Sequence, residues 1–134
     1  MALVGPRCIG KTSLLFHLSD PTVFSAYSLS QADYFFIYLD CSDLHNLDQN
    51  SLCRFLLEQV HETLLDRNLR PGAFIRPDEG APVTFHAFER TCRNLTRQGW
   101  KLILLLDDFE RLSQNPYLDA DFFSGLHALA AQCF

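Results

Sequence analysis

The sequence predicts an α/β domain in which helices flank a mostly parallel sheet in three α/β/α layers. Two short apolar runs, Tyr34–Leu39 and Leu102–Leu106, are almost free of polar residues, as expected for central parallel strands buried on both faces. Segments with helical spacing separate these runs, and such alternation favours a layered α/β fold. A glycine-rich turn, Gly5–Thr12, joins a further apolar run to a helix. The 134 residues fit one domain, residues 1–134.

The first part of the chain contains a strand end, a helix and a loop. Ala2–Val4 is a short apolar run that stops at a glycine, as the end of a buried strand would. Lys11–Ser19 has the spacing of a helix. One side of this helix carries three leucines, Leu14, Leu15 and Leu18. Residues 20–33 are polar and open with an Asp-Pro pair, so they are predicted to form a loop.

Two amphipathic helices follow the strand at Tyr34–Leu39. The first spans Ser51–Arg67, with Asn50 or Ser51 as its cap. Residues 68–82 hold three prolines and two glycines and are predicted to form a loop. The second helix spans Val83–Gln98 and ends at a glycine. Its expected buried stripe consists of Phe85, Phe88, Cys92 and Leu95.

The last part of the chain contains a strand, a loop and a helix. Leu102–Leu106 is the strand, and two aspartates follow it directly. Residues 113–118 include a proline and are predicted to form a loop. A final helix is expected to begin at about Asp119 or Asp121. Its apolar face is expected to contain Phe122, Phe123, Leu126, Leu129, Ala130 and Cys133.

Composition excludes several classes of protein. The net charge of −5 argues against a nucleic-acid binder, whose surface would be basic. The five cysteines include no C-x-x-C pair, so they indicate reduced thiols rather than a disulfide framework or a zinc site. No signal peptide is visible, and the longest apolar run is far below the ~20 residues that cross a bilayer. We therefore expect a cytoplasmic protein that does not interact with membranes.

The segment Gly5-Pro6-Arg7-Cys8-Ile9-Gly10-Lys11-Thr12 matches the phosphate-binding pattern G-x-x-x-x-G-K-S/T, known as Walker A. Its glycines let the backbone approach a phosphate, and its N–H groups form a nest for anions. The positive end of the following helix supports the same charge. Lys11 is expected to reach the β- and γ-phosphates, and the Thr12 hydroxyl to ligate Mg²⁺. The predicted nucleotide-binding residues are Gly5, Pro6, Arg7, Cys8, Ile9, Gly10, Lys11, Thr12 and Ser13.

An apolar strand that ends in acidic residues, here Asp107-Asp108-Phe109-Glu110, is typical of a Walker B element. Asp107 is expected to hold Mg²⁺ through water, because this ion prefers oxygen ligands and keeps part of its hydration shell. Asp108 is expected to orient or deprotonate the attacking water, with Glu110 as the alternative base. With Lys11, these are the predicted catalytic residues.

The runs LVGPRCIGKTSLL, YFFIYLDCSDL and LILLLDDFERL resemble the signalling P-loop ATPases of the STAND and AAA-like, archaeal-type groups. Cys8 replaces the second arginine that phosphate loops of this group often carry, and Asp108 replaces the usual glutamate. The resemblance implies ATP and Mg²⁺ as ligands and a sheet order of 5-1-4-3-2. This chain supplies strands one to three and stops after the Walker B helix. We therefore expect an incomplete sheet, or strand one paired directly with strand three, and protein partners or self-association through regions absent here.

The sequence suggests three candidate functions. The first is ATP binding, with slow magnesium-dependent hydrolysis, as the nucleotide-binding core of a signalling-type ATPase switch. The second is a truncated, catalytically inactive nucleotide-binding or interaction fragment, which differs from the first only in turnover. The third is a small GTPase or a small-molecule kinase. A GTPase is disfavoured because Asp107 does not begin a D-x-x-G motif and no N-K-x-D guanine motif is present. A small-molecule kinase is disfavoured because an acidic pair after a long apolar strand is less typical of that class.

Other residues have simpler explanations beside their functional ones. Asp40, at the end of a strand, either lines the nucleotide crevice or caps the next turn. Cys8 lies where a helix N-terminus could lower its pKa and make it sensitive to oxidation, but we favour the simpler interpretation, a filler residue. The stripe His86, Arg90, Arg93 and Arg97 either meets an acidic partner or is a solvated helix face, which we favour.

Overall fold

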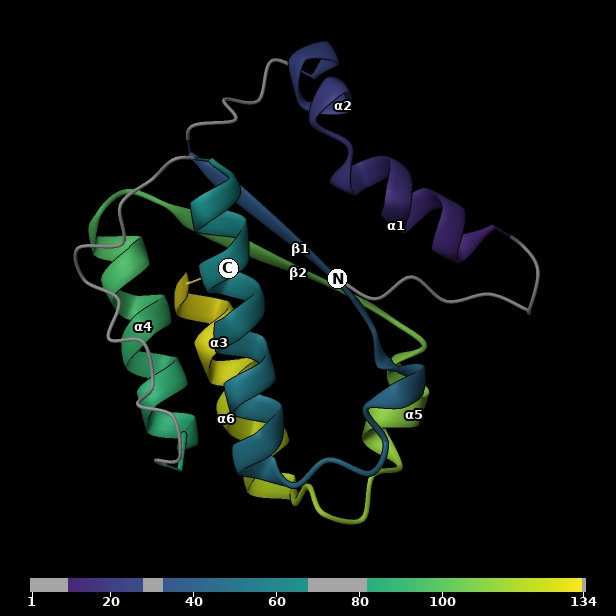
Figure 1. Ribbon diagram of the computed structural model, residues 1–134, viewed down its shortest axis with the longest axis vertical. Helices are drawn as coiled ribbons and strands as arrows, with labels where there is room; N and C mark the ends of the chain where they lie inside the picture. Colours follow the sequence, from purple (N-terminus) through teal and green to yellow (C-terminus); the bar gives the residue numbers. More distant parts are fainter. Residues whose placement is uncertain (1–9, 28–32, 68–81, 134) are drawn as a thin grey trace.

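The computed structural model describes residues 10–27, 33–67 and 82–133 (Figure 1). The described elements, in chain order, are α1 (Lys11–Ser19), α2 (Pro21–Ala26), β1 (Tyr34–Asp40), the 3₁₀ turn η1 (Cys41–Asp43), α3 (Gln49–Asp66), α4 (Phe85–Arg97), β2 (Lys101–Asp107), α5 (Phe109–Ser113) and α6 (Ala120–Cys133). The α/β class is therefore confirmed. The predicted strand at Ala2–Val4 lies outside the described residues, as does its pairing.

In the described part of the chain, β1 and β2 form a two-stranded parallel sheet. The register runs from Tyr34 beside Lys101 to Asp40 beside Asp107, so the two strands end together. This pairing agrees with the expected order, in which strands two and three are neighbours.

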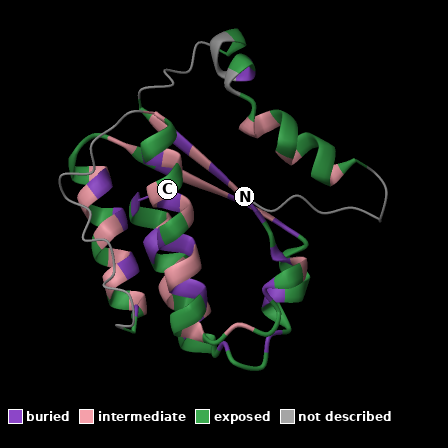
Figure 2. Ribbon diagram, viewed as in Figure 1, coloured by how far each residue is buried: buried purple, intermediate pink, exposed green. Residues whose placement is uncertain are grey.

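One face of the sheet packs on the helical core. Phe35, Ile37 and Leu39 of β1 are buried on this face, in a cluster that α3, α4 and α6 complete (Figure 2). The predicted stripe of α4 is confirmed at Phe88, Cys92 and Leu95, whereas the ring of Phe85 is half-buried.

The other face of β1 contradicts the prediction of a strand buried on both sides. Tyr34, Phe36 and Tyr38 point away from the helical core and are only half-buried. Helix α1 contacts both strands, and the Phe16 ring stacks on Tyr38 with 4.3 Å between the ring centres. No residue of α1 is buried, so its expected apolar side packs loosely, and Leu14 is 43% exposed.

Several predicted helix boundaries are wrong because of aspartate caps. Helix α3 begins at Gln49, since Asp48 Oδ1 accepts from the N–H groups of Asn50 and Ser51 at 3.0 Å. Part of the expected 20–33 loop is helix α2, because Asp20 Oδ1 accepts from Thr22 N–H at 2.8 Å and starts a new turn. The short helix α5 was also not predicted.

Two other boundaries agree with the sequence analysis. Asp119 Oδ1 accepts from Phe122 N–H at 2.8 Å, which places the start of α6 where it was expected. Gly99, just after α4, has φ +88°, the left-handed conformation of a helix-ending glycine.

Candidate functional site

The start of α1 and the ends of both strands lie on the same side of the molecule. Figure 1 shows α1 running back across the sheet, so that its first turn lies toward the side where β1 and β2 finish. In parallel α/β sheets, ligands bind outside the carboxyl ends of the strands. The candidate site is therefore this carboxyl edge, formed by the first turn of α1 and the ends of β1 and β2 at Asp40 and Asp107.

Only the last part of the predicted phosphate loop can be placed. Gly5, Pro6, Arg7, Cys8 and Ile9 lie outside the described residues. Gly10 precedes α1 with φ +91° and ψ +18°, a left-handed conformation that a side chain would strain. A left-handed residue followed by helical ones turns successive N–H groups to one side, which is the geometry of an anion nest.

The first turn of α1 carries the next three predicted residues. The Lys11 side chain is half-buried, whereas Thr12 and Ser13 are exposed. Their backbone N–H groups belong to the first turn, where a helix offers no acceptors of its own. No acidic residue lies in this turn to compete for an anion. The turn thus combines N–H donors, a hydroxyl and an ammonium group.

Asp107 is one of two buried polar residues among those described, with 7% of its surface exposed. Its Oδ2 accepts from the Tyr38 hydroxyl at 3.0 Å, and its Oδ1 accepts from Asp108 N–H at 3.1 Å. The two hydrogen bonds fix the orientation of the Asp107 carboxylate. Each oxygen keeps a further lone pair, so the carboxylate can still hold a water of a magnesium shell.

Asp108 and Glu110 are both exposed, beyond the buried end of β2. Asp108 has φ +49° and ψ +38° at the start of α5, the left-handed region in which a non-glycine residue is uncommon. Such conformations cluster at functional sites, although aspartate tolerates them better than most residues. Glu110 lies in the first turn of α5. Both predicted bases are thus accessible to solvent.

Asp40 is the neighbour of Asp107 across the sheet. Its Oδ1 accepts from Ser42 N–H at 2.9 Å, and hydrogen bonds from Ser42 lower the pKa of the Asp40 carboxyl. The capping role considered for this residue is therefore confirmed. The cap also keeps a negative charge beside Asp107.

Sequence reasoning missed Tyr38, which it assigned to the buried core of a strand. Burial, followed by the hydrogen bond to Asp107 and the charges of the nearby aspartates, raises the pKa of Tyr38 to about 12. The hydroxyl is therefore a donor at neutral pH. The sequence pattern that could have identified Tyr38 is the alternation of side chains along β1, which places residues 34, 36 and 38 on one face of the sheet.

Within the described residues, no group of three or more His, Cys, Asp or Glu side chains could hold a metal ion. This finding does not conflict with a magnesium site, because Mg²⁺ is commonly bound by one or two carboxylates together with water and substrate phosphates. Thr12 and Asp107, the two predicted ligands, supply oxygen atoms of the required kind.

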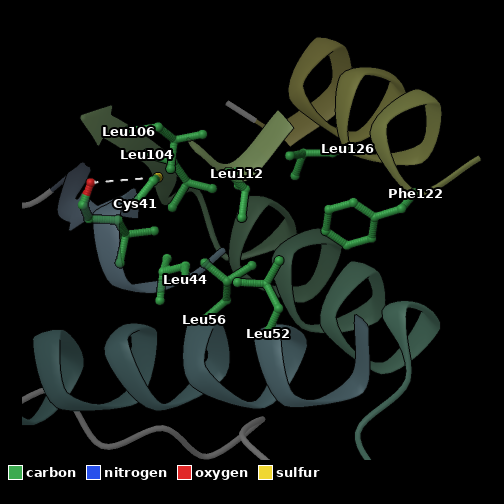
Figure 3. Close-up of a pocket in the computed structure, with 10 residues that line it drawn as sticks. Cys41, Leu44, Leu52, Leu56, Leu104, Leu106, Leu112, Phe122 and Leu126 are labelled. Atoms are coloured by element: carbon green, nitrogen blue, oxygen red, sulfur yellow. Dashed lines mark hydrogen bonds between the residues drawn. The ribbon is translucent and has the colours of Figure 1, made fainter. Parts of the chain in front are cut away.

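A hydrophobic pocket lies on the opposite face of the sheet, inside the helical core (Figure 3). Its lining is Leu39, Cys41, Leu44, Leu52, Leu56, Leu104, Leu106, Leu112, Phe122 and Leu126. The Cys41 thiol points to Leu39 O at 3.9 Å, and burial raises the pKa of this thiol to about 12. A pocket of this composition cannot stabilise a triphosphate.

The basic stripe on α4 is partly neutralised. Glu89 pairs with Arg93 at 2.7 Å and with His86 at 3.4 Å. Arg93 first, and then His86, lower the pKa of the Glu89 carboxyl. This arrangement matches a solvated helix face with local ion pairs.

No protein-family model matches the chain, and no match was found among curated proteins or solved structures. Among the described residues, no helix has the length and apolar character needed to span a membrane.

Proposed function

We propose that this chain binds ATP with magnesium at the carboxyl edge, as the nucleotide-binding core of a signalling-type P-loop ATPase. The proposal rests on one observation, namely that the start of α1 and the buried Asp107 lie at the same edge of the sheet. The last glycine of a complete phosphate-loop pattern is left-handed and starts a helix that faces the same edge as the buried Asp107.

In this proposal the loop Gly5–Thr12 wraps the phosphates, and Lys11 contacts the β- and γ-phosphates. The Thr12 hydroxyl and, through water, Asp107 hold the magnesium ion, which neutralises charge on the phosphates. Asp108 orients or deprotonates the attacking water. Its exposed position after β2 leaves room for that water. The preference for adenine follows from the resemblance and from the missing guanine motifs.

The binding test is a titration of the purified chain with a fluorescent ATP analogue, with and without Mg²⁺, and with GTP as competitor. We expect magnesium-dependent binding that ATP displaces better than GTP. Lys11→Ala should abolish binding. Lys101→Ala is the matched control, because Lys101 is an exposed lysine at the opposite edge of the sheet, with its Nζ 5.2 Å from the Tyr34 ring centre. Equal affinities for wild type and Lys11→Ala would refute the site.

Turnover separates the switch from a binding-only fragment. Asp108→Asn should keep nucleotide affinity and trap bound ATP, with hydrolysis slowed by at least about 10²-fold if Asp108 is the base. Asp121→Asn, an exposed aspartate at the start of α6, is the control and should hydrolyse ATP like wild type. Unchanged turnover in Asp108→Asn would move the base role to Glu110. Binding without any turnover would leave the inactive fragment as the function.

A further inference from the structure

Helix α1 packs loosely against the sheet, although it contacts both strands. None of its residues is buried, and its exposed apolar residues include Leu14 at 43% and Phe16 at 54%. The ring of Phe16 nevertheless stacks on Tyr38, with 4.3 Å between ring centres and 28° between ring planes. This stack is therefore a direct side-chain link between α1 and strand β1.

The same tyrosine holds the acidic side of the site. Its hydroxyl donates to Asp107 Oδ2 at 3.0 Å, across 69 positions of sequence. The two side chains lie on one face of the sheet, because Tyr38 pairs with Leu105 and Asp107 is two residues further along β2. One residue thus contacts α1 with its ring and the Asp107 carboxylate with its hydroxyl.

From this geometry we infer that Tyr38 is a positioning residue, which sets the orientation of the Asp107 carboxylate relative to α1. The inference rests on the proposed magnesium–nucleotide site. Groups that hydrogen-bond to a metal-binding carboxylate orient it, and their loss typically weakens metal binding by 10–100-fold. Because Asp107 is proposed to act through water, we expect the lower end of this range.

Tyr38→Phe tests the hydroxyl alone, since it keeps the ring and its stack on Phe16. The analogue's affinity in EDTA should stay within about twofold of wild type. The Mg²⁺ concentration that gives half of the maximal increase in affinity for the analogue should rise about tenfold. Tyr34→Phe is the matched control, because it removes the same atom from the same face of β1 at the opposite end, and it should change neither value.

Phe16→Leu tests the other half of the link, because it removes the stack and keeps the hydroxyl. We expect it to raise the magnesium requirement as well. In the double variant with Tyr38→Phe, the rise should be no larger than in Tyr38→Phe alone, because both changes break one connection. Independent effects would instead multiply, and that result would overturn the coupling.

A purely structural role for Tyr38 would give a different pattern. It would lower the unfolding midpoint and weaken binding equally with and without Mg²⁺. That pattern, or an unchanged magnesium requirement in Tyr38→Phe, would overturn the inference while leaving the proposed function intact. If wild type fails to bind the analogue, or if Lys11→Ala binds equally well, then the proposed function falls and the inference falls with it.

Discussion

Asn115 is the second buried polar residue among those described, with 3% of its surface exposed, and it ties together the segments that follow the two strands. Its Nδ2 donates to Leu44 O at 3.1 Å and to Leu47 O at 2.8 Å, and its Oδ1 accepts from Tyr117 N–H at 2.9 Å. The side chain therefore joins the chain after η1 to the chain after α5. We expect Asn115→Ala to destabilise the fold at this junction.

The size of the loss follows from the burial of the three partners. The bond to Leu44 O is fully buried, but this carbonyl keeps a second bond from Leu47 N–H at 3.3 Å, so the loss costs about 0.5–1.5 kcal/mol. The other two bonds are partly buried, and water can replace each at a cost of about 0.5–1 kcal/mol. The sum is roughly 1.5–3.5 kcal/mol, a large share of the ~5–15 kcal/mol that stabilises a typical domain.

Urea unfolding followed by circular dichroism measures this loss. With a slope of about 2 kcal/mol per molar urea, the midpoint should fall by roughly 1–2 M at unchanged slope. Asn46→Ala is the matched control, because Asn46 lies between Leu44 and Leu47, is exposed, and its side chain hydrogen-bonds to the ring of the adjacent His45 at 2.9 Å. A difference between the two variants below about 0.5 kcal/mol would refute the role given to Asn115.

Two further predictions concern the core. A Cβ added at Gly125 would lie 2.8 Å from Phe85 Cε1, and the Phe85 ring is already packed edge-on against Phe122. Gly125→Ala should therefore lower the free energy of unfolding in urea by about 1–2 kcal/mol, although alanine has the better helix propensity. Ser124→Ala, at an exposed position of the same helix, is the control and should leave stability unchanged. Burial raises the pKa of Cys41 to about 12 and of Cys53 to about 11, from 9.0. Above pH ~9 the unfolded chain loses these thiol protons while the folded protein keeps them, so the free energy of unfolding should be constant below that pH and fall as pH rises toward ~11. The fall should be shallower in Cys53→Ala. If wild type and Cys53→Ala lose stability with the same slope up to pH ~10.5, the prediction is contradicted.

Local pattern was enough for most of the secondary structure. The apolar runs of both strands, the spacing of α3, α4 and α6, and Gly99 after α4 were predicted correctly. These signals depend on neighbours within a few residues, since period and turn chemistry are local properties. Aspartate caps are local too, but several candidates stand in a row near residue 50, and only the backbone geometry selects Asp48.

In the candidate site, too, some features follow from the sequence and others only from the tertiary structure. The sequence by itself determined the hypotheses for this site, because the spacing from Gly5 to Thr12 suggests a phosphate loop and the acids after Leu106 suggest a magnesium carboxylate. It could not determine which side chains hold those groups. Tyr38 looks like any aromatic residue of an apolar strand until β1 and β2 pair in register and bring its hydroxyl to Asp107. Contacts across 69 residues depend on strand register and helix packing, which only the tertiary structure decides.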